Sequence, residues 1–267
     1  MEGNAAGEKS DLPVQLRYFA CRGRGQALRY ILVDAGHPFE EAVVSALGET
    51  WKAKKEAHRF SGPFGSLPVL QWGDYTVAQT EAIAHYLGQK LDYYGSDTSP
   101  EQTCKADMLV SAAYQDLIQP FLALFWSPIR AKGSDTKDLL SQFYNVKVKD
   151  LLPRFQALLG DKSFFIDEER PTIADFFVFE ALDLLGTCLG HDNLFHSDKE
   201  EGLQKLREFH GRMLERPNIA LYFGGKGPCP PFFRPVTLSP AEEEVQHVMD
   251  AFALELEAAR SSSASSS

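Results

Sequence analysis

The sequence predicts a fold in two parts, a small α/β half followed by an all-helical half. From residue 14 to residue 90, apolar residues alternate between the two-residue period of strands and the spacing of helices. After residue 100 only the helical spacing recurs, as far as about residue 223. Residues 95–100 (GSDTSP) have the turn-forming composition of a linker, so we place the boundary there.

The first half opens with strand and helix signals in alternation. Apolar side chains occupy every second position of residues 14–20, which predicts a strand, and the glycine-rich segment 21–25 (CRGRG) ends it. Residues 26–35 carry apolar side chains at helical spacing, and residues 39–44 predict a second strand. The basic residues 51–60 then predict a short exposed helix or an ordered loop.

A hairpin and a helix complete this half. Residues 66–72 and 75–78 are strand-like runs separated by Gly73-Asp74, a pair that favours the dihedral angles of a tight turn. Gln79-Thr80-Glu81 then open a helix that continues to Lys90, and we expect Thr80 to cap its free backbone N–H groups. The element order is therefore βαβ and then ββα.

The clearest signal in the second half is the start of a buried helix. Thr172-Ile-Ala-Asp175 fits the Ser/Thr-x-x-Asp capping pattern in front of the apolar residues 176–185. Residues 224–235 are too rich in glycine and proline for regular structure, whereas residues 239–260 predict an amphipathic helix before a serine-rich tail. We expect a flexible N-terminus (1–13), an α/β domain (14–94), a linker (95–100), an all-α domain (101–224) and a C-terminal extension (225–267).

Composition excludes several classes of protein. The 27 Lys and Arg against 37 Asp and Glu give a net charge of −10 with no basic block, so no nucleic-acid partner is expected. No apolar stretch approaches the ~18 residues of a membrane span, and we expect an intracellular protein without one. The 4 cysteines lie far apart without CxxC pairs, and the 7 histidines show no metal-ligand spacing, so neither a disulfide framework nor a metal site is expected.

Five motifs in order carry a family resemblance. They are Tyr18-Phe19 with Arg22-Gly-Arg24, Trp51, Leu67-Pro68, Gln79-Thr80 and the cap at 172–175. Together they resemble the cytosolic glutathione transferases from about residue 14 to residue 224, and the tyrosine-type pi and sigma patterns fit best. The resemblance implies the glutathione transferase fold, with a thioredoxin-like α/β domain and an all-α C-terminal domain. It also implies glutathione as co-substrate, small hydrophobic electrophiles as second substrates, a homodimer and a cytoplasmic detoxification enzyme.

Two residues are implied to be catalytic, Tyr18 and Arg24. The glutathione thiol has a pKa of about 8.5 in solution, yet its thiolate is the nucleophile, so the anion must be stabilised. Tyr18 would donate its phenol hydrogen to the sulfur, and the N-terminus of the first helix would add a favourable dipole. Two pKa units correspond to about 2.7 kcal/mol, which a charge-assisted hydrogen bond and a dipole can supply. Arg24 would add a positive field.

The resemblance assigns further residues to glutathione. Leu67, before a cis Pro68, would pair its backbone with the cysteinyl part like an added strand. Gln79 and Thr80 lie at a helix N-terminus, which suits the γ-glutamyl carboxylate, although a plain helix cap is the simpler alternative. An ordinary edge-strand proline is likewise the alternative at Pro68.

The glycyl carboxylate is implied to bind Trp51 and Lys55 through an indole N–H and an ammonium group. Lys52 and Lys54 crowd the same segment, so the lysine register stays open. The partner subunit of the dimer is implied to contribute Asp116 to the α-amino group.

Counting from Asp107 along the family pattern without a gap places Gln115, rather than Asp116, at the position that reaches across the dimer. For the second substrate, an apolar site formed by Phe19, Arg24, Phe125 and Trp126 is expected, with core packing as the alternative for the aromatic residues. Phe64 matches the residue that inserts into the other subunit.

Three other functions stay open. A sigma-like isomerase would act on a prostanoid endoperoxide with the same site. Cys21, close to a helix N-terminus, could instead be the nucleophile, as in thiol transferases. A crystallin-like or lipophile-carrier protein would retain the fold without strong catalysis, and the helix 239–260 would then cover the hydrophobic site or bind another protein.

Overall fold

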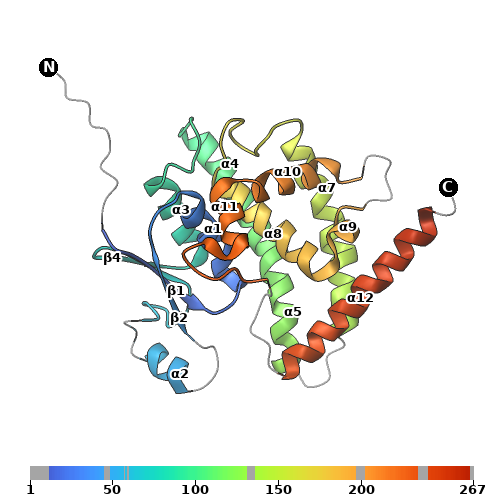
Figure 1. Cartoon of the computed structure of the whole chain (residues 1–267), viewed down its shortest axis with the longest axis horizontal. Coiled ribbons are helices and arrows are strands. Elements are labelled where there is room, and N and C mark those ends of the chain that lie inside the picture. Colours follow the sequence, from blue (N-terminus) through green and yellow to red (C-terminus); the bar gives the residue numbers. More distant parts are fainter. Residues whose placement is uncertain are drawn as a thin grey trace.

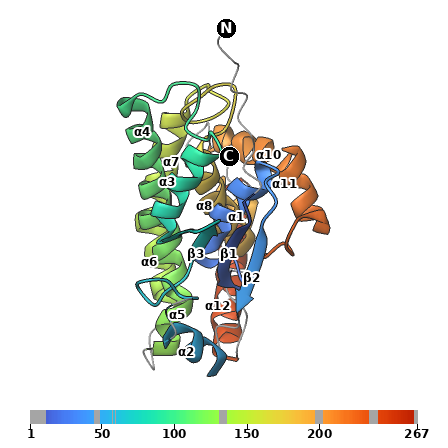
Figure 2. The same cartoon turned by 90° about the vertical axis from the view of Figure 1, so that its left-hand side faces the viewer.

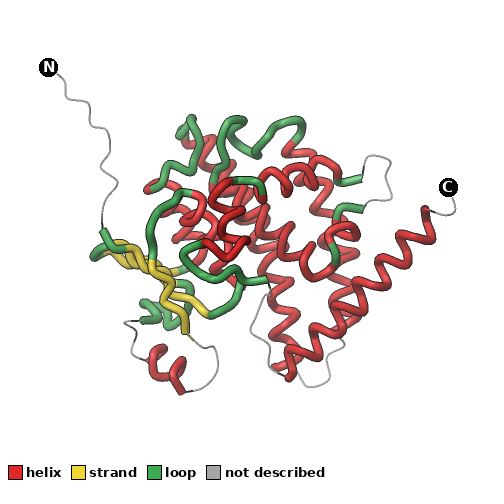
Figure 3. Tube along the Cα trace, in the orientation of Figure 1, coloured by secondary structure: helices red, strands yellow, loops and turns green. Residues whose placement is uncertain are grey.

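The computed structural model describes residues 12–44, 49–56, 58, 60–130, 136–196, 202–233 and 240–264. The predicted two-part architecture is confirmed: a four-stranded mixed sheet with its helices is followed by a helical domain (Figure 1). Figure 3 shows that the strands gather at one end of the molecule and that helices form the rest.

The sheet has the strand order β2-β1-β3-β4. Its strands are β1 (Val14–Phe19), β2 (Glu40–Val44), β3 (Val69–Trp72) and β4 (Tyr75–Ala78). β2 runs parallel to β1, which requires the crossover helix α1 (Gln26–Asp34), whereas β3 and β4 are antiparallel to their neighbours. The expected hairpin turn is present, because Gly73 has a φ of 58° that glycine adopts without steric cost.

Two more helices belong to this half, α2 (Glu49–Glu56) and α3 (Thr80–Lys90). α1 contacts α3 on one side and the central helix of the second half on the other. In Figure 2, β2 points toward α2 at the lower end of the sheet.

The helical half is built around α8 (Ile173–Leu189), which is buried along almost its whole length. Its start confirms the predicted capping box, because the Asp175 carboxylate accepts hydrogen bonds from the Thr172 backbone N–H at 2.7 Å and from the Thr172 hydroxyl at 2.8 Å. The other helices of this half are α4 (Pro100–Ser111), α5 (Gln119–Arg130), α6 (Thr136–Phe143), α7 (Lys149–Leu159), α9 (His191–Leu194), α10 (Gln204–Leu214) and α11 (Pro217–Leu221). Short π-helical turns, η2 (Ala112–Ile118) and η3 (Tyr144–Val148), join α4 to α5 and α6 to α7.

One continuous hydrophobic core runs through both halves, from the sheet across α1 to α8. A buried ionic contact crosses the same interface: Arg22, just after β1, lies 2.8 Å from Asp183 of α8 and also pairs with Glu180 at 2.5 Å. Because this polar contact is enclosed by the core, removing one partner would leave an uncompensated buried charge.

The predicted C-terminal helix is present as α12 (Pro240–Ala264). It contacts α5, α6, α8 and α9, and buries Met249 and Phe252 against them (Figure 1). The residues from Gly227 to Phe233 before it have no regular structure, as the glycines and prolines predict. The prediction is wrong for residues 224–226, which belong to a π-helical turn, η4 (Tyr222–Lys226), and residues 234–235 lie outside the described residues. Among the described residues, no helix has the length and apolar character needed to cross a membrane.

Candidate functional site

Four of the predicted site residues meet in a small apolar cluster on the sheet, apart from the main core. Tyr18 and Leu67 are buried in this cluster, and Phe19 and Trp51 pack against it. The Phe19 and Trp51 rings meet edge to face with centroids 5.1 Å apart. The expected cis peptide bond between Leu67 and Pro68 is present at the start of β3. We call this group, with its buried neighbours Cys21, Val44, Val69 and Ala78, the Tyr18 cluster.

The turn after β1 is shaped around the Tyr18 ring. A Cβ atom on Gly23 would lie 2.4 Å from the Tyr18 hydroxyl, and one on Gly25 would lie 2.8 Å from Cδ1 of the ring. Gly23 also has a φ of 42°. Any side chain at these two positions would displace the phenol, so the glycines of the CRGRG segment are needed for this close approach.

The Tyr18 hydroxyl is held as a neutral hydrogen-bond donor. It accepts a hydrogen bond from the Arg24 backbone N–H at 2.6 Å, and no acceptor in the described part of the chain takes its hydrogen. Burial raises the pKa of the Tyr18 phenol well above its usual value, with Cys21 adding to the effect and the Arg24 N–H opposing it. The phenol therefore stays protonated at neutral pH and can donate a hydrogen bond to a bound ligand.

The start of α3 differs from the sequence prediction. Thr80 does not cap the helix: Gln79 is the N-cap residue, with φ 76° and ψ 125°, and no side chain caps the helix. Thr80 is the first helical residue, so its hydroxyl lies inside the first turn and is used elsewhere. The backbone strain at Gln79, an exposed non-glycine residue, is of the kind that occurs at ligand-binding positions.

The Thr80 hydroxyl links the start of α3 to both halves of the molecule. It donates to the Arg24 carbonyl at 3.2 Å and accepts from the Tyr114 hydroxyl at 3.0 Å. Tyr114 in turn accepts a hydrogen bond from Gln119 at 3.0 Å. Since the N–H of Arg24 binds Tyr18, one chain of hydrogen bonds runs from the helical half to the Tyr18 phenol, and we call it the Tyr114 relay.

Sequence reasoning missed Tyr114 as a site residue. It lies in η2, a π-helical turn, and such turns are frequent at functional sites because they change the direction of side chains within a helix. No pattern in the sequence indicates that turn.

The three lysines of α2 have different surroundings. Lys54 lies with its ammonium 4.1 Å from the centre of the Phe60 ring, a cation–π contact. Lys55 is exposed, and its stem lies beside Gly65, where an added Cβ would be 3.6 Å from Lys55 Cγ. Lys52 is exposed. Lys55 is thus placed next to the loop that leads to Leu67.

Asp116 and Gln115 point to different neighbours. Asp116 forms a partly exposed ion pair with Lys147 at 3.5 Å, within the helical half. The Gln115 amide donates at 2.8 Å to the carboxylate of Glu81, in the first turn of α3. Of the two, Gln115 is the residue beside the N-terminus of α3.

The second-substrate residues are only partly placed. Phe19 lies in the Tyr18 cluster, and the Arg24 side chain is exposed. Phe125 and Trp126 belong to α5, but their side chains lie outside the described residues. Phe64 is 67% exposed, and its role in a dimer stays a prediction.

A separate groove of about 760 Å³ lies between the edge of β2 and residues 228–230, away from the Tyr18 cluster, and contains none of the predicted site residues.

Comparisons with known proteins identify related chains. Residues 14–89 match the family model "Glutathione S-transferase, N-terminal domain", and residues 115–225 match "Glutathione S-transferase, C-terminal domain". The chain is 29% identical to glutathione S-transferase P of Homo sapiens over 214 residues, which cover 79% of this chain and 91% of that protein. It is 30% identical to hematopoietic prostaglandin D synthase of Gallus gallus over 209 residues, 78% of this chain and 94% of that protein.

Among solved structures, the glutathione S-transferase of Ascaris lumbricoides superimposes with a TM-score of 0.67 at 23% identity, over 80% of this chain and 97% of that one. At this identity the likeness speaks for the fold alone.

Proposed function

The chain belongs to the glutathione S-transferase family, and from this premise we propose that it ionises glutathione at the Tyr18 cluster and transfers it to hydrophobic electrophiles. One observation carries the proposal: the buried Tyr18 phenol accepts the Arg24 N–H at 2.6 Å and keeps its own hydrogen for an outside acceptor. A sulfur anion is an acceptor of this kind. Accepting the N–H polarises the phenol and makes it a better donor.

The proposed reaction begins with loss of the thiol proton to solvent. Tyr18 then donates a hydrogen bond to the thiolate. A charge-assisted hydrogen bond stabilises the anion by about 1.5–3 kcal/mol, which lowers the pKa of the thiol by about one to two units. The thiolate attacks the electrophilic carbon, a C–S bond forms, and the leaving group departs with its electron pair. Because the pKa of Tyr18 is raised, the phenol stays protonated throughout.

The peptide would lie along the surfaces described above. The free N–H groups in the first turn of α3, at Gln79 and Thr80, suit the γ-glutamyl carboxylate. The Thr80 hydroxyl already makes hydrogen bonds with Arg24 and Tyr114, so binding of the carboxylate would depend on the backbone N–H groups. The backbone of Leu67 would pair with the cysteinyl part, and Trp51 and Lys55 would hold the glycyl carboxylate.

The dimer and second substrate complete the proposal. The exposed Phe64 would insert into a second copy of the chain. The partner subunit would supply Asp116 or Gln115 to the α-amino group, and the contact of Gln115 with Glu81 is made within one subunit. Phe19, with Phe125 and Trp126, would form the apolar site for the electrophile, in a cytoplasmic detoxification enzyme.

The surroundings of Cys21 favour Tyr18 as the group that activates sulfur. Cys21 is only 7% exposed, inside the cluster, so its thiol is shielded from a disulfide partner. A thiolate there would also lose solvation.

The test is Tyr18→Phe, with Tyr94→Phe as the matched control, since Tyr94 donates its hydroxyl to Asp107 at 2.9 Å, away from the Tyr18 cluster. Tyr18→Phe should still bind immobilised glutathione. The pKa of the bound thiol, followed by thiolate absorbance, should rise by about one to two units, and kcat/KM with a chloronitrobenzene should fall about 10- to 100-fold. Tyr94→Phe should change neither. An unchanged thiol pKa in Tyr18→Phe would refute the proposal.

A second candidate is isomerisation of a prostanoid endoperoxide by the same thiolate. The match to the chicken prostaglandin D synthase, at 30% identity, supports isomerisation. The match to the human transferase, at 29% identity, supports transfer to an electrophile equally well. Product analysis with an endoperoxide and with a chloronitrobenzene, both in wild type and in Tyr18→Phe, separates the two. Glutathione binding without either turnover would instead indicate a carrier.

A further inference from the structure

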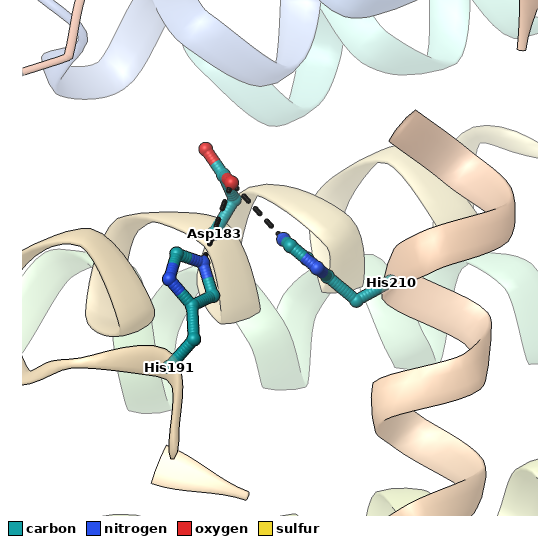
Figure 4. Close-up of side chains that lie close together, drawn as sticks. All are labelled: Asp183, His191 and His210. Carbon is teal, nitrogen blue, oxygen red and sulfur yellow. Dashed lines mark hydrogen bonds and ion pairs between the residues drawn. The ribbon is translucent and has the colours of Figure 1, made fainter. Parts of the chain in front are cut away.

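We propose that Asp183, His191 and His210 form a binding site for a divalent transition-metal ion, with Zn²⁺ as the best fit, where α8, α9 and α10 meet. Figure 4 shows both imidazole rings directed at the same carboxylate. Nε2 of His210 lies 3.0 Å from Oδ1 of Asp183, and Nε2 of His191 lies 3.7 Å from that oxygen. All three ligand atoms are within 4.8 Å of one another.

The two distances to Asp183 are close to those around a tetrahedral ion. With metal–ligand bonds of about 2.0–2.2 Å, neighbouring ligand atoms of Zn²⁺ are separated by about 3.3–3.6 Å. The separation at His210 is slightly shorter and the one at His191 slightly longer than this range. Two imidazoles and one carboxylate are a ligand set that Zn²⁺ accepts, and the fourth position would be left to water.

His191 supplies an independent observation. Its Nε2 atom is buried and has no hydrogen-bond partner. Buried polar atoms are nearly always paired, so this nitrogen, which points at Asp183, lacks the ligand that its position calls for. The side chain as a whole is 41% exposed, whereas those of Asp183 and His210 are 7% and 8% exposed. An ion can therefore enter past His191 and bind beneath it.

The helix backbone leaves room for the His191 ring. A Cβ atom on Gly186, in the interior of α8, would lie 2.4 Å from Cδ2 and 2.6 Å from Nε2 of His191. A glycine inside a helix destabilises it by about 1 kcal/mol relative to alanine. Here it allows the imidazole to lie against α8, one turn from Asp183.

The carboxylate is oriented from the other side. Arg22 binds Oδ2 of Asp183 at 2.8 Å, which leaves Oδ1 facing the histidines. Partners of this kind fix the orientation of metal-binding carboxylates. Arg22, Asp183 and Glu180 together carry one net negative charge in a buried place when ionised, which a bound cation would offset.

The site has no counterpart in the sequence patterns. Its ligands are 8 and 19 residues apart along the chain, by their numbers 183, 191 and 210, and no short metal motif has this spacing. It also lies on the helical half, outside the Tyr18 cluster.

The experiment uses the full chain, treated with a chelator and dialysed, with Zn²⁺ as the probe in calorimetric titration and thermal unfolding. Wild type should bind one Zn²⁺ and unfold at higher temperature. His191→Ala, the variant of the most exposed ligand, should weaken binding at least about tenfold. The matched control is His85→Ala, because His85 is 37% exposed, close to the 41% of His191, and pairs with Asp107 at 2.9 Å outside this site.

Co²⁺ provides a second readout that does not depend on a variant. Its visible absorption should show the strong bands of tetrahedral coordination in wild type, and these should be absent in His191→Ala and present in His85→Ala. The proposal is overturned if wild type binds no Zn²⁺, if His191→Ala binds it as tightly as wild type, or if His85→Ala loses it equally.

Discussion

Removing the Tyr114 hydroxyl tests whether the helical half controls the reactivity of Tyr18. Tyr114→Phe deletes the hydrogen bond to the Thr80 hydroxyl, 3.0 Å long, and keeps the ring in place. Thr80 still donates to the Arg24 carbonyl, whereas the partly buried Gln119 amide loses the Tyr114 hydroxyl as its acceptor. The substitution therefore removes the Tyr114–Thr80 hydrogen bond of the Tyr114 relay and keeps the hydrogen bond between Thr80 and Arg24.

Of the two hydrogen bonds that Tyr114→Phe deletes, the one to Thr80 reaches the start of α3 and sets the expected effect on activity. Such a bond contributes about 0.5–1.5 kcal/mol, which corresponds to about 2- to 12-fold in a rate or binding constant. We expect kcat/KM for glutathione to fall within this range, mainly through KM, because Thr80 begins the helix at which the γ-glutamyl carboxylate would bind. The pKa of the bound thiol should rise, but less than in Tyr18→Phe.

The assay is steady-state kinetics with varied glutathione, together with the pH dependence of thiolate absorbance. Tyr93→Phe is the control: it removes a hydroxyl that donates to Asp34 at 2.6 Å, with no contact to the relay. It should lower the free energy of unfolding and leave kcat/KM unchanged. The reasoning is wrong if Tyr114→Phe behaves as wild type, or if Tyr93→Phe loses as much kcat/KM.

Three further outcomes are expected. Burial opposes ionisation of Asp167, but hydrogen bonds from Glu169, Ser96 and Arg170 lower its pKa to about 2, below the value of about 3.9 in the unfolded chain. Asp167→Asn should therefore lose about 2 kcal/mol of unfolding free energy above about pH 5. Urea titrations at several pH values should find that the difference in stability between wild type and the variant vanishes toward about pH 2. Gly25→Ala would place a methyl group 2.8 Å from the Tyr18 ring and should abolish most activity in a folded protein. Gly211→Ala, whose added methyl group would have nothing within 4 Å, should keep full activity. Equal activities of the two variants would contradict the close packing of the turn around Tyr18. Arg22→Met removes the cation that pairs with the buried carboxylates of Glu180 and Asp183, and Asp183 keeps its contacts with His210 and Tyr30. The substitution should cost about 3–5 kcal/mol in urea denaturation, and a loss below about 1 kcal/mol, as for a surface ion pair, would contradict this.

Local sequence signals predicted the elements because each depends on neighbouring residues. The alternation of residues 14–20 gave a strand that ends at Phe19, one residue early, where the glycine-rich turn begins. The cap at Thr172 and Asp175 was found from spacing alone, because both partners lie within one helical turn. The predicted helix 239–260 differs from α12 by only a few residues at its ends.

Thr80 shows where this reasoning fails. A threonine beside a helix start is a good capping candidate by propensity, yet its hydroxyl binds Arg24 and Tyr114, which are 56 and 34 residues away. Propensity describes which partners are near in sequence. The tertiary fold brought stronger partners, so Gln79 took the cap position.

The sequence by itself determined the order of strands and helices, the glycine-rich turn after the first strand and the family motifs, because these rest on periodicity and on steric limits between near neighbours. Only the tertiary structure decided that Gln115 rather than Asp116 lies beside α3, that Tyr114 is linked to Tyr18, and that two histidines converge on Asp183. Each of these depends on contacts between segments far apart in the chain, whose geometry is set by how α1, α3 and α8 pack together.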